Sequence, residues 1–214
     1  LPFVAVKVAQ SLDGKIATRR GASKWITEKR ARLYSRSLRD KYDAVLVGVN
    51  TVIKDNPKLN GNKKVPFKII LDPDLIIPKN SYIFKNFQEK LIIVTSFKKM
   101  NLVKKMPPKI KIILSKEVDK KFDLKELLKT FYNIGITSIF VEGGSYTLGS
   151  FFDQKVVDKI YFFIAPKIIG GKEAISSIGG LGCALPNKCI SLKEVSLKYI
   201  GKDILLTAYP YYQE

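Results

Sequence analysis

The chain has 214 residues, is 46% hydrophobic and carries a formal net charge of +19. This length and apolar content predict one domain with a hydrophobic core and exclude an intrinsically disordered chain. No apolar run reaches the roughly 20 residues of a membrane-spanning helix, and the first residues lack the pattern of a secretory signal.

The chain contains no histidine and only two cysteines, Cys183 and Cys189. The absence of histidine excludes Ser-His-Asp and Cys-His nucleophile chemistry. Two thiols without histidine cannot build a zinc site, so we predict no metal. Any acid or base must be Asp, Glu, Lys or Tyr, unless the reactivity belongs to a bound cofactor. We expect both cysteines to be reduced and partly buried, as in a cytoplasmic protein.

The positive charge has two interpretations. It could attract nucleic acid or phosphorylated small molecules, or it could reflect a lysine-rich surface alone. The lysines are scattered in pairs such as Lys63-Lys64 and Lys104-Lys105, without a block of like charges. No recognition helix, RNP motif or basic stripe indicates nucleic-acid binding, so we expect no nucleic-acid partner.

A strand is predicted at residues 3–9, and a polar, glycine-marked segment follows to residue 26. Thr27 is a candidate N-cap for a helix that runs to about Asp40. Apolar runs then predict strands at 42–47, 66–71, 90–95, 109–114, 138–141 and 159–166. Helices are predicted from just after Gly48 to about Lys54, at 123–133 and at 145–153.

The tail of the chain has a different pattern. Strands at 191–199 and 203–209 are joined by a hairpin signal at 200–203. The preceding alternation of strands and helices predicts an α/β domain with a mostly parallel sheet and helices on both faces. The sheet should be mixed, with antiparallel strands at its C-terminal edge. A long glycine-rich loop, 168–186, is expected to cover or build a site.

The clearest local feature is the turn Glu142-Gly143-Gly144 between a strand and a helix. Glycines allow close approach to a phosphate, and the following helix offers free N–H groups and a positive dipole end. A tight strand-to-helix turn also requires glycine, so this feature alone leaves both interpretations open. Glu142 itself could hold a ribose hydroxyl or take part in proton transfer, or it could be a solvent-facing acid.

Two further junctions follow strand ends. Asp13 could cap the turn at 11–15 or take part in chemistry, and Trp25 could be a core residue or stack on a flat ring. Arg39 could bind a phosphate or complement the helix dipole. Thr51 and Asp55 are four residues apart and therefore share one side of a short helix. Three polar junctions of this kind favour one shared site.

Taken together, several segments resemble the reductase domain of riboflavin biosynthesis. They are Lys7, SLDGKIA (11–17), GASKWIT (21–27), Leu38-Arg39, DAVLVGVNTVIKDNPKL (43–59), VEGG (141–144) and IAPKIIGG (164–171). The resemblance implies a dihydrofolate-reductase-like fold and an NADPH-dependent reduction of a ribosyl group to a ribityl chain. The Trp of GASKWIT is similar to the bacterial type, in which a deaminase domain precedes one reductase domain, here 1–214. That type acts on 5-amino-6-(5-phosphoribosylamino)uracil.

The resemblance also implies roles for individual residues. The positions that match cofactor contacts are Ala9, Trp25, Thr51, Asp55, Gly144, Ser145, Tyr146, Thr147, Leu148, Gly149 and Ser150. The positions that match substrate contacts are Ser23, Arg39, Leu59 and Glu142. Lys7, Asp55 and Glu142 are the candidates for polar assistance while hydride reaches C1′ of the opened ribosylamine.

Two departures from the family pattern stand out. After Leu59 the family usually has Thr-x-Arg, whose Arg helps to hold the substrate phosphate, whereas this chain has Asn60-Gly61-Asn62. Pro73 replaces a Ser that contacts the cofactor in some relatives.

The resemblance further implies a homodimer in the cytoplasm, with a phosphorylated pyrimidine as its small-molecule partner and no membrane partner. Two alternatives are a related reductase of the same fold that acts on another pyrimidine or pteridine, and a basic nucleic-acid-binding module without catalysis.

Overall fold

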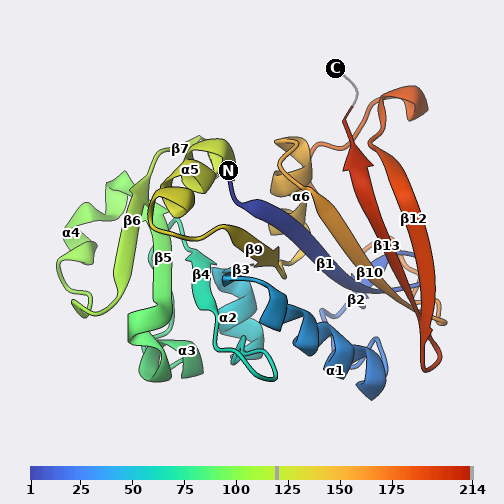
Figure 1. Cartoon of the computed structure of the whole chain (residues 1–214), viewed down its shortest axis with the longest axis horizontal. Coiled ribbons are helices and arrows are strands. Elements are labelled where there is room, and N and C mark those ends of the chain that lie inside the picture. Colours follow the sequence, from blue (N-terminus) through green and yellow to red (C-terminus); the bar gives the residue numbers. More distant parts are fainter. Residues whose placement is uncertain (119–120, 213–214) are drawn as a thin grey trace.

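The computed structural model describes residues 1–118 and 121–212, and its central feature is a nine-stranded sheet (Figure 1). In chain order the strands are β1 (Phe3–Ser11), β3 (Ala44–Gly48), β4 (Phe67–Leu71), β5 (Leu91–Ser96), β6 (Lys111–Ser115), β9 (Ser138–Val141), β10 (Lys159–Ala165), β12 (Ser191–Ile200) and β13 (Asp203–Tyr211). Across the sheet the order is β12-β13-β10-β1-β9-β3-β4-β5-β6.

The strands from β10 to β6 all pair in parallel, whereas β13 is antiparallel to β10 and β12 is antiparallel to β13. The predicted mixed sheet with an antiparallel C-terminal hairpin is therefore confirmed. Shorter pairs lie outside it, namely β2 (Lys15–Ala17) with β11 (Ile175–Ser176) and β7 (Glu117–Val118) with β8 (Lys121–Phe122).

Helices cover both faces of the sheet, as predicted (Figure 1). One face packs against α1 (Lys29–Leu38), α2 (Val49–Asp55) and α3 (Tyr82–Asn86), and the other packs against α5 (Leu124–Asn133) and α6 (Ser145–Asp153). Strand β3 shows the reason. Val45 and Val47 belong to the core on the face of α1, α2 and α3, whereas Ala44 and Leu46 belong to the core on the face of α5 and α6. Because alternate residues of a strand point to opposite faces, continuous apolar runs form strands that are buried on both sides.

The predicted start of the first long helix is wrong by one residue. The N-cap is Glu28, and Thr27 is buried. The backbone N–H of Glu28 donates to Asp203 of β13 at 2.7 Å, so a contact from the far end of the chain fixes where the helix begins. The sequence also gave no indication of α3, of α4 (Met100–Val103) or of the four short strands, whose lengths are too small for a periodic pattern.

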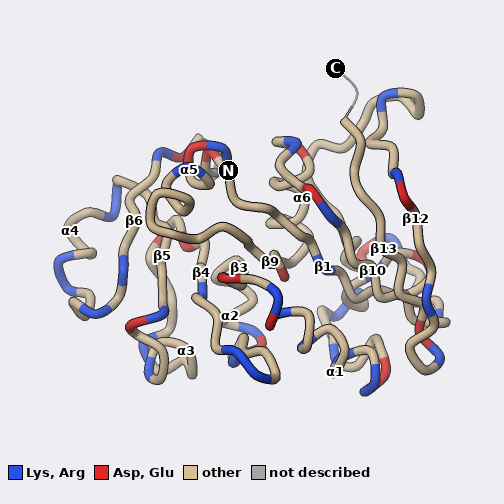
Figure 2. The backbone as a smooth tube through the Cα atoms, in the orientation of Figure 1, with Lys and Arg blue, Asp and Glu red and all other residues tan. Residues whose placement is uncertain are grey.

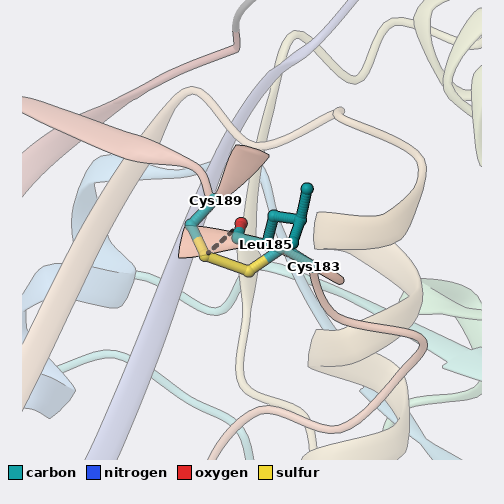
Figure 3. Close-up of a disulfide and its surroundings, with 3 residues drawn as sticks. All are labelled: Cys183, Leu185 and Cys189. Atoms are coloured by element: carbon teal, nitrogen blue, oxygen red, sulfur yellow. Dashed lines mark hydrogen bonds between the residues drawn. A yellow bond between two sulfur atoms is a disulfide. The ribbon is translucent and has the colours of Figure 1, made fainter. Parts of the chain in front are cut away.

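The expectation of reduced cysteines is also wrong, although Cys189 is partly buried as expected. Cys183 and Cys189 form a disulfide in the segment before β12, and Cys183 is exposed (Figure 3). A 3₁₀ turn at Pro186–Lys188 reverses the chain and brings the two Cα atoms to 5.2 Å. Disulfides persist mainly in oxidising compartments, so the cysteines no longer indicate a cytoplasmic location.

The glycine-rich loop lies directly along α6. Gly179 N–H donates to the Ser145 carbonyl at 3.0 Å, and Leu181 N–H donates to the Asp153 carboxylate at 3.0 Å. A Cβ on Gly149 would lie 2.3 Å from the carbonyl carbon of Gly179, so only glycine permits this crossing of helix and loop.

We therefore expect Gly149→Ala to lower the free energy of unfolding by about 1–3 kcal/mol, because two backbones would have to separate. Urea denaturation of purified variants measures this effect. Gly144→Ala on the same helix is the matched control, since a Cβ there meets no atom within 4 Å. Equal stability of the two variants would contradict the tight crossing.

Candidate functional site

The carboxyl ends of β1, β9, β3 and β4 meet at one edge of the sheet, because these strands run parallel to one another. The three polar junctions therefore come together there, as the sequence predicted. They line a cavity of about 670 Å³, to which the segment after β3 contributes Gly48 to Thr51 and the segment after β9 contributes Gly144 to Thr147. A second cavity of about 380 Å³ adjoins it and shares Ile16, Ser23, Thr51, Asp55 and Gly144.

The N-terminus of α6 borders the larger cavity. Gly144 is its N-cap, and a glycine has no side chain that could accept a hydrogen bond from the first turn of the helix. The space beside Gly144 is open, so an anionic group can approach the N–H groups and the positive end of the helix dipole. This end of the cavity is suited to a phosphate or diphosphate.

The residues predicted to contact the cofactor fall into two groups. Those that line a cavity are Ala9, Trp25, Thr51, Asp55, Gly144, Ser145, Tyr146, Thr147, Leu148 and Ser150. Gly149 lines neither cavity, since it faces the glycine-rich loop. Leu148 lines the smaller cavity but is mainly a core residue, because the helical repeat turns it towards the sheet.

Trp25 is 65% exposed at the rim of the smaller cavity, so its interpretation as a core residue is wrong. The guanidinium of Arg32 lies 4.2 Å from the centre of its ring, in a cation–π contact. The Lys167 side chain donates to the Trp25 carbonyl at 3.2 Å. These contacts hold the indole at the cavity mouth rather than in the core.

Glu142 lies at the centre of a charge cluster and is largely buried, so its interpretation as a solvent-facing acid is wrong. Arg39 donates to both carboxylate oxygens, from Nε at 2.5 Å and from Nη2 at 3.0 Å. The Nζ of Lys7 lies 3.9 Å from Glu142 Oε2. Such a bidentate pair is strong and geometrically specific.

The three charges shift one another's pKa values. Burial acts to raise the pKa of Glu142, but attraction to Arg39 and Lys7 holds it below its usual value. Burial lowers the pKa of Lys7, and this effect outweighs the opposing attraction of Glu142. Burial also acts to lower the pKa of Arg39, but Glu142 keeps it above its usual value. Glu142 is therefore an anion at neutral pH, and Lys7 is the more readily deprotonated of the two cations.

Two of the predicted substrate contacts line neither cavity. Leu59 is buried in the core on the face of the sheet that α1 and α2 cover, and Arg39 reaches the site only through Glu142. The other two, Ser23 and Glu142, line the smaller cavity. Arg39 also donates from Nη1 to the Asn60 carbonyl at 2.9 Å, so it connects Glu142 to the loop after Leu59.

Asp13 is a structural tether. Its carboxylate accepts hydrogen bonds from the Ser11 hydroxyl at 2.6 Å and from the N–H groups of Ile169 and Gly170 at 3.0 and 2.7 Å. The Ser11 hydroxyl, and then the two N–H groups, lower the pKa of Asp13 to about 2. The turn thereby holds the start of the glycine-rich loop, whose Ile175 lines the larger cavity.

Several residues that line the larger cavity were not predicted. They are mostly apolar or lie far along the chain: Ile16, Leu71, Asp72, Asp74, Ile76, Lys121, Phe122, Leu124 and Ile175. Pro73, one of the two departures from the family pattern, also lines it. Apart from Ile16, which lies in the segment SLDGKIA, none of these residues belongs to a local motif, so only the tertiary structure could have placed them.

Within the described residues, no group of three His, Cys, Asp or Glu side chains could hold a metal ion. None of the helices in that part of the chain has the length and apolar character needed to cross a membrane.

Comparison with known proteins gives a consistent result. Residues 2–206 match the RibD C-terminal domain family. The riboflavin biosynthesis protein RibD of Actinobacillus pleuropneumoniae is 37% identical over 210 residues, which are 96% of this chain and 56% of that protein. The chain thus spans little more than half the length of this relative.

Solved structures agree on the fold. A diaminohydroxyphosphoribosylaminopyrimidine deaminase/5-amino-6-(5-phosphoribosylamino)uracil reductase from Thermotoga maritima superposes with a TM-score of 0.78 at 32% identity, over 98% of this chain and 57% of that one. Dihydrofolate reductase from Enterococcus faecalis superposes with a TM-score of 0.52 at 12% identity, over 97% of this chain and 96% of that one. The predicted dihydrofolate-reductase-like fold is confirmed.

The charge cluster yields a test. We expect Glu142→Gln to lower the free energy of unfolding by about 2 kcal/mol at pH 7, because two partly buried cations lose their counter-ion. Folding lowers the pKa of Glu142. The difference in unfolding free energy between the variant and the unmodified protein should therefore be largest above the ordinary Glu pKa of about 4.3, and it should diminish as the pH falls below that value. Denaturation at several pH values measures it.

Glu89→Gln is the matched control, since Glu89 pairs with Lys109 on the surface and should contribute less than about 1 kcal/mol. A Glu142→Gln effect that is equally small, or that does not change with pH, would contradict the described cluster.

Proposed function

The chain belongs to the RibD C-terminal domain family, the pyrimidine reductases of riboflavin biosynthesis, and we propose that it is an NADPH-dependent enzyme. Its substrate would be 5-amino-6-(5-phosphoribosylamino)uracil, whose ribosyl group becomes a ribityl chain. The observation that carries the proposal is the pair of adjoining cavities at the carboxyl edge of the sheet. One has an open helix N-terminus, and the other has a buried ionic cluster.

The larger cavity fits the cofactor. Its volume of about 670 Å³ lies within the usual range for small-molecule sites, and the N-terminus of α6, where Gly144 has no capping side chain, suits the diphosphate. Thr51 and Asp55 project from one side of α2 towards the junction of the two cavities. When bound, NADPH supplies the hydride that reduces C1′ of the substrate.

The smaller cavity would hold the substrate. The ribosylamine of the substrate opens to an imine, and the reduction then adds hydride at C1′ and a proton at the nitrogen. Glu142 stays ionised and therefore accepts hydrogen bonds from ribosyl hydroxyls rather than donating a proton. Lys7 lies beside it with a lowered pKa, which suits a side chain that holds or moves a proton. Asp55 borders both cavities and so can orient both ligands.

The direct test mixes the protein with NADPH and freshly prepared substrate and follows the loss of nicotinamide absorbance. We expect turnover, and we expect Asp55→Asn to reduce kcat/KM at least about tenfold through loss of a charged contact. Glu173→Gln is the control, because Glu173 is an exposed carboxylate outside both cavities.

Absence of both turnover and NADPH binding would contradict the proposal. Turnover only with another pyrimidine or a pteridine would identify a related reductase. Steeply salt-dependent binding of nucleic acid without cofactor affinity would identify a binding module. Against that last alternative, Lys and Arg are spread over the whole fold rather than gathered on one element (Figure 2).

We propose a homodimer as the working form. On one face of the C-terminal strands, Leu197 pairs with Leu206 and Tyr199 pairs with Ile204, and β10 continues the apolar row with Phe162 and Ile164. Leu197 and Tyr199 are 66% and 76% exposed. An apolar face that includes the edge strand β12 can complement itself across a two-fold axis, so a second copy of the chain is the occupant that fits. The cytoplasmic location stays a prediction.

A charge on this face should dissociate the dimer. We expect Leu197→Glu to shift the sedimentation of the protein from dimer to monomer while its circular dichroism stays unchanged, since the side chain is exposed. Ser196→Glu places the same charge on the opposite face of β12 and should leave the dimer intact. A monomeric unmodified protein, or equal effects of both substitutions, would contradict the proposed interface.

A further inference from the structure

Three arginines, two in α1 and one directly after its last residue, lie on one side of the helix. Arg32, Arg36 and Arg39 follow a spacing of four and then three residues, which places side chains on the same side. Each donates a hydrogen bond to a backbone carbonyl: Arg32 to Thr27, Arg36 to Gly61 at 3.0 Å and Arg39 to Asn60 at 2.9 Å. Arg32 lines the smaller cavity, and Arg39 reaches it through Glu142. Arg36 lies between these two along the helix, and the Gly61 carbonyl holds its side chain.

The three guanidinium groups differ in the contacts that they already make. Arg39 is neutralised by Glu142, and Arg32 lies over the Trp25 ring. Arg36 is exposed and, among the described residues, uses only its Nε. Both terminal nitrogens of Arg36 are therefore available as a fork, which matches the oxygens of a phosphate in a bidentate contact.

The loop at residues 60–64, whose Gly61 carbonyl accepts the Arg36 hydrogen bond, has no cation at position 62, where the family usually has an arginine. Asn62 has no charge, and its N–H donates to the Asp40 carboxylate at 3.1 Å, as do the N–H groups of Lys63 and Lys64 at 3.0 and 2.9 Å. The loop is thus fixed around Asp40. On the same loop Asn60 Oδ1 is buried and accepts no hydrogen bond from the described residues, a state that a donating ligand hydroxyl would relieve.

We propose that Arg36 anchors the phosphate monoester of the substrate in this chain, so that the helix supplies the guanidinium that the loop lacks at position 62. This inference rests on the proposed function. It explains why a loop without arginine at position 62 is compatible with a phosphorylated substrate: the fork of Arg36 is fixed beside that loop by the Gly61 carbonyl.

Calorimetry with ribose 5-phosphate and with ribose tests this anchor without turnover. We expect the unmodified protein to prefer ribose 5-phosphate, and Arg36→Gln to weaken that ligand about tenfold or more while leaving ribose unchanged. Arg36→Lys keeps the charge but loses the fork of two nitrogens. Its affinity for ribose 5-phosphate should therefore lie between those of the unmodified protein and Arg36→Gln. In steady-state assays Arg36→Gln should raise KM for the phosphorylated substrate without changing kcat or NADPH affinity.

Arg30→Gln is the matched control, since Arg30 lies on the opposite face of α1, beside Gly201, and its removal costs the same charge. Equal loss in both variants would show a general field effect and overturn the anchor. So would equal weakening of ribose and ribose 5-phosphate, or no preference in the unmodified protein. If ribose 5-phosphate binding depends on Arg36 but NADPH is not oxidised, the anchor stands and the proposed reductase function fails.

Discussion

The Glu142 carboxylate is the interaction on which the site depends. It lies at the end of the central strand β9, and its two partners come from β1 and from the end of the first long helix. A charge in such a position is stable only when it is paired, so burial forces Lys7 and Arg39 to converge on it. Arg39 in turn holds the Asn60 carbonyl. One ion cluster thus connects β9, the end of α1 and the loop at Asn60, and its carboxylate lines the smaller cavity.

The larger cavity depends on a second constraint, the close crossing of α6 and the glycine-rich loop. Gly149 permits the crossing, and Asp13 holds the beginning of the same loop through two N–H groups. The loop can then place Ile175 in the wall of the cavity that residues of α6 also line. Neither Gly149 nor Asp13 lines a cavity, yet the shape of the site depends on both.

The large positive charge has a limited role in this arrangement. Most lysines are dispersed over the surface, and the cations that matter are those held in defined geometry beside the smaller cavity. Arg39 and Lys7 are paired with Glu142 and Arg32 lies over the Trp25 ring, which leaves Arg36 of α1 to attract an anion. Position and available hydrogen-bond donors, rather than net charge, decide which cations can recognise a phosphate.

The sequence by itself determined the sheet and the edge at which the site lies. Apolar runs such as 44–47 need burial on both faces, and parallel strands bring their carboxyl ends together, so the junctions at Thr51, Glu142 and Gly144 had to meet. Tertiary structure alone decided the rest. It turned Trp25 outward and Leu59 inward, joined Cys183 to Cys189, and moved the helix start from Thr27 to Glu28. These outcomes depend on partners far along the chain, such as Asp203 for Glu28, and no local pattern of residues encodes a distant partner.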